Sequence, residues 1–278
     1  MGRIFAAVSG ERTTVATAIE EHYRPVYSGA PLPETAVGAI LSISDKIDSI
    51  VGCFSVGLKP TGAADPYALR RQGIGIIQVV LDQGLGISLS GLIEESLKRF
   101  EPDNSQGVKD QVHAFLQNRM TGLLAEDGFS KDSIAAVLSA SCDNIPETWS
   151  KVEALERLKA KPDFEPLAAA FKRVVNIIKK ADDVEGGDIK PALFEHPSEA
   201  ALLDAYELVN RQIEEDLAAG SFDQALVKIA SLRDTVDDFF DGVMVMADNL
   251  EIRRNRLLLL GQIAALFGKF ADFSKIST

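Results

Sequence analysis

The spacing of the apolar residues limits the possible folds most strongly, because apolar side chains recur every three or four positions along most of the chain. Val15, Ala18 and Ile19 follow this spacing, as do Leu167 and Phe171 much later. Such spacing places apolar side chains on one face of a helix, whereas the alternation typical of a half-buried strand is absent. The sequence therefore predicts an all-α, multi-helical fold.

Proline, glycine and asparagine separate the periodic stretches and mark the expected ends of the helices. On this basis the principal helices are expected at residues 13–23, 33–51, 66–83, 108–126, 166–181, 198–219, 222–240 and 249–270. The two helices at 198–219 and 222–240 are expected to form an antiparallel hairpin. The acidic segment from Asp182 to Asp188 is expected to be a solvated loop.

The residues from Lys59 to Arg71 carry the clearest helix start in the chain. Pro60 and Gly62 interrupt the preceding apolar run, and Asp65 can accept hydrogen bonds from the open amides of a following turn. Pro66 then fits the first helical position, where its missing N–H group costs nothing. This stretch is therefore predicted to be a loop that leads into a capped helix.

Two glycines, Gly73 and Gly75, interrupt the helix that follows. A glycine inside a helix costs roughly 1 kcal/mol relative to alanine, so both are expected where another helix approaches closely. They do not form a phosphate-binding loop, because the rest of that motif is missing.

The composition is that of an ordinary soluble globular protein of about two domains, with 278 residues, 46% of them hydrophobic and 25% charged. The net charge of −12 excludes a generally basic RNA-coating protein, so any contact with nucleic acid must come from a local basic patch. Cys53 and Cys142 are expected to be reduced core thiols. No apolar run reaches about 18 residues and no signal-peptide pattern is present, so we expect a cytoplasmic protein without a membrane segment.

Several strings resemble bacterial glycyl-tRNA synthetase β subunits. The Lys-Pro-Thr-Gly loop at Lys59 and the following Asp-Pro-Tyr-Ala-Leu-Arg-Arg string resemble a signature of that family. AIEEHYRP and LPETAVGAILSISDKIDSIVGCF are similar to the second half of its HD-type helical domain, and FKRVVNIIKKA to its anticodon-binding region. FFDGVMVM and RRNRLLLL resemble the closing helices of its DALR-type domain, although only the aliphatic-Arg ending of the Asp-Ala-Leu-Arg string is present, at Ile252 and Arg253.

This resemblance covers nearly the whole chain and implies the C-terminal portion of a longer subunit, beginning inside a domain. It implies three regions: the C-terminal part of an HD-like helical domain at 1–62, a helical linker region at 63–144 and a DALR-type anticodon-binding helical domain at 145–278.

Basic residues concentrate in two of the helices within the last region. In the helix expected at 166–181, cations and an amide share one side, and further arginines begin the last helix. The predicted RNA-binding residues are Lys172, Arg173, Asn176, Lys179, Lys180, Arg253, Asn255 and Arg256. The cations would hold phosphates, while an exposed amide at Asn176 or Asn255 could meet an unstacked base. A merely solvated charged face is the alternative.

Metal-dependent chemistry is not expected. In HD phosphohydrolases several His and Asp side chains hold metal ions, but only His22 and Asp45 could belong to such a set here. One imidazole and one carboxylate do not make a hydrolytic centre, so we predict no catalytic residue and no metal site. His22 is expected to be a helix-end or core histidine, and a divergent HD phosphohydrolase is a weak alternative.

The resemblance implies the tRNA-binding portion of a glycine–tRNA ligase β subunit, a component of protein biosynthesis. Its expected partners are glycine tRNA and a separate catalytic α subunit, in an α2β2 assembly of the full-length protein. ATP and magnesium would bind the α subunit, and we expect no cofactor in this chain and no contact with DNA or a membrane. An all-α protein–protein scaffold is the alternative that tRNA binding would exclude.

Overall fold

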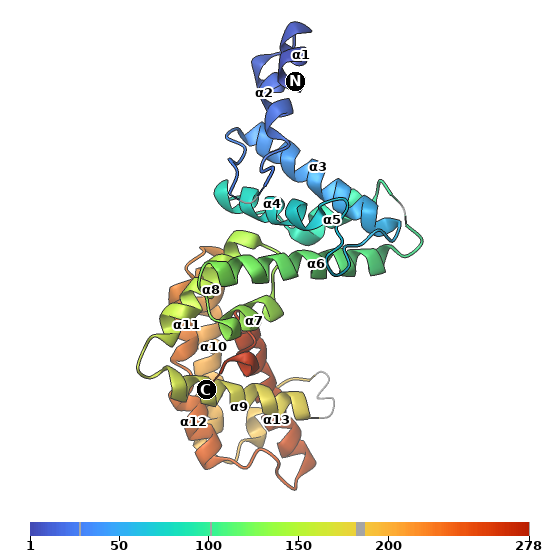
Figure 1. Ribbon diagram of the computed structural model, residues 1–278. Coiled ribbons are helices and arrows are strands. Elements are labelled where there is room, and N and C mark those ends of the chain that lie inside the picture. The colour runs from blue at the N-terminus through green and yellow to red at the C-terminus, as the bar shows by residue number, and fades with distance from the viewer. Residues whose placement is uncertain (28, 101, 182–186, 278) are drawn as a thin grey trace. The chain divides into compact units, whose positions relative to one another are not determined.

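Helices make up the regular structure of the residues that the computed structural model describes (Figure 1). These residues are 1–27, 29–100, 102–181 and 187–277. Within them, β-type pairing is limited to two isolated bridges, Thr61 with Ala64 and Ser88 with Asn144. The predicted all-α fold is therefore confirmed, whereas most of the expected acidic loop, 182–186, lies outside the described residues.

Two compact units divide the chain. Unit 1 consists of Met1–Asp127 with Cys142–Thr148, and unit 2 consists of Gly128–Ser141 with Trp149–Thr278. Packing therefore groups residues 128–141 with the C-terminal half of the chain. The division into 1–62, 63–144 and 145–278 stays a prediction.

Unit 1 is built around one long helix, α3. Its helices are α1 (Gly2–Val8), α2 (Thr13–Glu21), α3 (Ala36–Ser55), α4 (Leu69–Asp82), α5 (Leu89–Leu97) and α6 (Ser105–Glu126). Helix α3 contacts α2, α4, α5 and α6, and it buries Ile50 and Val51 completely. Its first turn is capped by the Thr35 hydroxyl, which accepts a hydrogen bond from the Gly38 amide at 3.1 Å.

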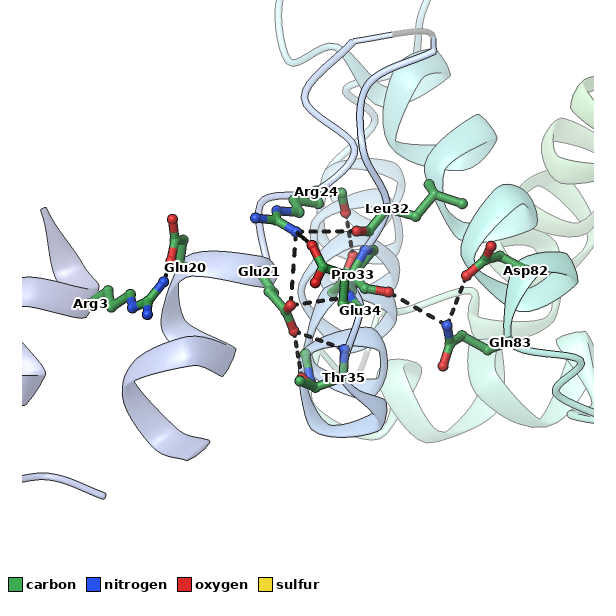
Figure 2. A network of polar contacts seen from close by, with 12 residues as sticks. Arg3, Glu20, Glu21, Arg24, Leu32, Pro33, Glu34, Thr35, Asp82 and Gln83 are labelled. Carbon is green, nitrogen blue, oxygen red and sulfur yellow. Dashed lines mark hydrogen bonds and ion pairs between the residues drawn. The ribbon is translucent and has the colours of Figure 1, made fainter. Parts of the chain in front are cut away.

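The buried carboxylate of Glu21 fixes the connection between α2 and α3, as Figure 2 shows. It accepts hydrogen bonds from the amides of Glu34 and Thr35 at 3.1 and 3.2 Å, and from the Thr35 hydroxyl. Burial alone would raise the pKa of Glu21, but these donors outweigh it, and the pKa lies below its ordinary value. A side chain on Gly38 would collide with this carboxylate, so α3 can approach it only at a glycine.

Helix α4 begins at Leu69, which corrects the prediction that Pro66 occupies the first helical position. The reason is Ala68, whose φ of 53° lies in the left-handed region and interrupts helical geometry just before the helix. The predicted role of Asp65 is confirmed, because its carboxylate accepts hydrogen bonds from the amides of Leu69 at 2.8 Å and Arg70 at 3.0 Å.

The two glycines of α4 lie where neighbouring side chains approach closely, as predicted. A Cβ atom at Gly73 would lie 3.2 Å from side-chain atoms of Phe115 and Leu116 in α6. A Cβ atom at Gly75 would lie 3.1 Å from Cε of Lys46 in α3. Both glycines therefore allow α4 to pack closely against its neighbours.

Unit 2 has an aromatic core. Its elements are α7 (Lys131–Ala140), most of α8 (Ile145–Lys159), α9 (Phe164–Lys180), η1 (Pro191–Leu193), α10 (Pro197–Ala218), α11 (Phe222–Ala230), α12 (Arg233–Gly242), α13 (Leu250–Gly268) and η2 (Phe273–Lys275). Phe171 of α9 stacks on Phe267 of α13 with ring centroids 3.9 Å apart, and Phe273 meets Phe171 edge-on at 5.2 Å. These rings hold α9, α13 and η2 together.

The predicted hairpin is present, but its second arm is divided. Helix α10 packs against both α11 and α12, and the single helix predicted at 222–240 is broken between Ala230 and Arg233. At the break, the Ser231 hydroxyl donates to the Lys228 carbonyl at 2.7 Å and the Thr235 hydroxyl to the Leu232 carbonyl at 2.9 Å. Such local bonds compete with continuous helical geometry.

Lys46 of α3 is a buried amine that shapes the pH dependence of unit 1. Its Nζ atom donates to the carbonyls of His22 at 2.9 Å and Arg24 at 3.0 Å and to the Ser42 hydroxyl at 2.7 Å. Burial lowers the pKa of Lys46 from 10.5 to about 8.

The unfolded chain therefore binds more protons than the folded chain between pH 8 and pH 10.5. Stability rises with pH wherever the unfolded state binds more protons, so the free energy of unfolding should rise through this window. Relative to Lys46→Met, the rise in the wild type should be on the order of 2–3 kcal/mol. Urea unfolding of both proteins at intervals across the window measures it, and parallel pH profiles would contradict the assignment.

Candidate nucleic-acid interface

Helix α9 has the two-sided character that the sequence predicted. Phe171 and Val174 are buried against the core of unit 2. On the opposite side Arg173, Lys179 and Lys180 are exposed, while Lys172 and Asn176 are half-buried. A basic face on this helix is therefore present, and its contact with RNA stays a prediction.

One side of this basic face is engaged by the residues that follow α13. Lys172 donates to the carbonyl of Ile276 at 3.3 Å, and Lys179 forms an ion pair with Asp272 at 2.9 Å and donates to the Ser274 hydroxyl at 2.6 Å. Burial would raise the pKa of Asp272, but hydrogen bonds from Ser274 and Lys179 outweigh it and lower the pKa. Lys172 and Lys179 thus brace the end of the fold.

The other side of the face carries Arg173, Asn176 and Lys180. The guanidinium carbon of Arg173 lies 3.9 Å from the ring centroid of Phe240 in α12, which indicates cation–π contact. Within the described part of the chain, neither Arg173 nor Lys180 has an ion-pair partner. These two residues are seven positions apart and therefore share one side of α9, with Asn176 between them. A guanidinium oriented by Phe240 and an exposed ammonium together suit phosphate groups.

Phe240 is a site residue that sequence reasoning missed. It lies in the pair Phe239–Phe240, where Phe239 is fully buried and Phe240 lies beneath Arg173. The available signal was that Phe240 directly follows the core residue Phe239. Its contact with Arg173 could not be predicted, because it depends on the packing of α9 against α12.

Two of the predicted RNA-binding residues on α13 are buried, and the expectation that they face outward is wrong. Asn255 is 3% exposed, and its amide exchanges two hydrogen bonds with the backbone of Lys190, at 2.7 and 3.1 Å. Arg256 is 5% exposed and lies on the inner side of the helix with Leu260 and Phe267. The helical register of these apolar residues was the signal for its burial.

Arg256 forms the main buried ion pair of unit 2. Its Nε atom lies 2.9 Å from Glu199, which is 0% exposed, and its Nη atoms reach Glu195 at 2.9 Å and the Met244 carbonyl at 3.1 Å. Burial would raise the pKa of Glu199, but the hydrogen bond from Arg256 and those from the amides of His196 and Glu195 outweigh it and lower the pKa. Arg256 is therefore a structural residue.

The remaining α13 residue, Arg253, is half-buried and donates from Nε to the Ala247 carbonyl at 2.8 Å. It orders the chain between α12 and α13. The structure thus does not assemble the eight predicted residues into one surface, and it leaves the Arg173, Asn176 and Lys180 side of α9 as the candidate interface.

His22 and Asp45 of the incomplete HD-like set lie in unit 1 around one open hollow of about 690 Å³. Nδ1 of His22 is 2.7 Å from the carbonyl oxygen of Ile19, and the ring packs on Tyr23 with centroids 3.9 Å apart. His22 is thus a helix-end histidine, as predicted. Among the described residues, no three His, Cys, Asp or Glu side chains gather as metal ligands would. That the chain holds no metal stays a prediction.

In the part of the chain that the structure describes, no helix combines the length and apolarity needed to cross a bilayer.

Two family profiles match different parts of the chain. The DALR anticodon binding domain profile matches residues 167–277, which include most of α9 and all of α10 to η2. Unit 2 is therefore built around an anticodon-binding type of helical domain. The profile described as glycyl-tRNA synthetase beta subunit matches residues 1–139.

Similar proteins match across both units. A glycine–tRNA ligase beta subunit from Desulfatibacillum aliphaticivorans is 47% identical over 283 residues, covering 100% of this chain and 40% of the relative. Those from Desulforapulum autotrophicum and Geobacter metallireducens are 47% and 44% identical, covering 99% and 100% of this chain and 40% of each relative. The chain belongs to the glycyl-tRNA synthetase beta subunit family, as the sequence resemblance predicted. It spans about 40% of the length of the curated relatives it matches.

Replacing Arg256 tests its structural role. Arg256→Met leaves the Glu199 carboxylate buried without its cation, which should lower the free energy of unfolding by about 3–5 kcal/mol. Arg253→Met removes a half-buried arginine with one backbone hydrogen bond from the same helix and should cost about 1 kcal/mol. Urea unfolding followed by circular dichroism compares the two variants, and equal losses would contradict the dependence of Glu199 on Arg256.

Proposed function

We propose that this chain is the RNA-binding part of a glycine–tRNA ligase beta subunit, and that unit 2 holds the anticodon arm of glycine tRNA. The observation that carries the proposal is the side of α9 formed by Arg173, Asn176 and Lys180, which lies within the residues matched to the anticodon binding domain. Arg173 rests on Phe240 with its N–H groups directed to no described acceptor.

In this proposal, the three side chains contact the RNA in different ways. Arg173 can grip a phosphate with its planar N–H groups or stack on an unpaired base, and Lys180 supplies a point charge. Asn176, between them, carries an amide that can pair with a base edge. Lys172 and Lys179 contribute mainly by bracing the segment after α13, because their amines already have partners.

The catalytic steps belong, in this proposal, to a separate alpha subunit that binds glycine, ATP and magnesium, within an α2β2 enzyme of the cytoplasm. The family membership is consistent with that division. A protein-facing role is the second candidate, favoured by one observation: α1 exposes Ile4, Phe5 and Val8 together.

Binding of glycine tRNA and of an unrelated tRNA across a salt series tests the proposal. Arg173→Gln with Lys180→Gln should reduce the slope of log affinity against log salt by about two, since each lost phosphate contact accounts for about one. A control variant, Lys131→Gln with Arg211→Gln, removes two exposed cations from α7 and α10. The slope of the control should stay unchanged. No tRNA binding by the wild type would contradict the proposed function.

A further inference from the structure

The loop that precedes α4 is an ordered, exposed element in unit 1 that the proposed function leaves without a role. Thr61 and Ala64 exchange two backbone hydrogen bonds at 3.0 and 2.8 Å, which closes a tight turn around Gly62. Arg70 of α4 donates from Nη2 to the Gly62 carbonyl at 2.8 Å and so ties this turn to the helix. The loop is therefore held in one shape although its residues face solvent.

Two arginine side chains lie near the first turn of α4: Arg70 belongs to that turn, and Arg119 reaches it from α6. The Cγ atom of Arg119 in α6 lies 3.4 Å from the place where a Cβ atom on Gly73 would be. Because Gly73 has no side chain, Arg119 can lie next to the first turn of α4. The Arg119 guanidinium lies 5.2 Å from the ring centroid of Phe115. Burial, and next the charge of Arg70, lower the pKa of Arg119, so these two like charges interact.

Among the described residues, neither Arg70 nor Arg119 takes part in an ion pair. Asp65 is the carboxylate whose charge acts on Arg119, but its oxygens already accept the amides of Leu69 and Arg70. Two like charges that lack a direct ion-pair partner repel each other, and a bound anion would offset that repulsion.

We infer that Arg70 and Arg119 form a second phosphate-binding site on unit 1, which contacts the sugar-phosphate backbone of the RNA that unit 2 binds. The inference rests on the proposed function for the identity of the RNA. Guanidinium groups favour phosphate, because their planar N–H donors match the phosphate oxygens. Tyr67, at the end of the same loop, is 51% exposed.

The test uses the full chain and glycine tRNA across a salt series. Arg70→Gln with Arg119→Gln should reduce the slope of log affinity against log salt by about two and weaken glycine tRNA and an unrelated tRNA alike, because backbone contacts carry no sequence information. Arg70→Lys with Arg119→Lys keeps both charges and should restore most of the slope. Circular dichroism and thermal unfolding check that each variant is folded.

The matched control is Arg3→Gln with Arg99→Gln, which removes two arginines from the same unit. Both are exposed and already paired, Arg3 with Glu20 and Arg99 with Asp48, so their loss should leave the slope unchanged. If the folded Arg70→Gln/Arg119→Gln variant still binds tRNA with an unchanged slope, the inference is overturned and the proposed function stands. The two arginines would then be a contact site for an acidic protein. Equal losses in the control and test variants would also overturn it. No tRNA binding by the wild type would remove the proposed function itself.

Discussion

The arrangement of unit 2 depends on the buried pair of Arg256 and Glu199. Glu199 has no exposed surface, and it is stabilised there because the guanidinium and two backbone amides all donate to it. The pair joins the start of α10 to the first half of α13 and so fixes the rotation of α13 about its axis. That rotation places Phe267 against Phe171, and Phe171 in turn sets which side of α9 faces solvent. Arg173 lies on the exposed side of the helix whose inner side carries Phe171.

Local sequence rules predicted the features that depend on neighbouring residues. The helical class, the capping by Asp65 and the close approaches at Gly73 and Gly75 follow from periodicity, hydrogen-bonding capacity and the cost of glycine in a helix. The start of α4 at Leu69 did not follow, because the left-handed conformation of Ala68 gives no signal in its side chain.

Features of the site that depend on packing were harder to predict. Charge and spacing alone placed Arg256 with Arg253 on one surface, but an arginine can be buried when a carboxylate is buried with it, and Glu199 lies 57 positions earlier. The division of the α9 face also depends on partners distant in sequence, since Asp272 and Ile276 engage one side while Phe240 supports the other.

Because Lys179 is paired with Asp272, an anionic ligand on that side of α9 would compete with a carboxylate of the protein itself. A phosphate that approaches Lys179 has to displace a carboxylate that the protein itself supplies at 2.9 Å, so one anion is exchanged for another and little is gained. At Arg173 no such internal substitute is present among the described residues. An anion that approaches α9 would therefore meet a competing carboxylate at the Lys179 edge and none among the described residues at the Arg173 edge.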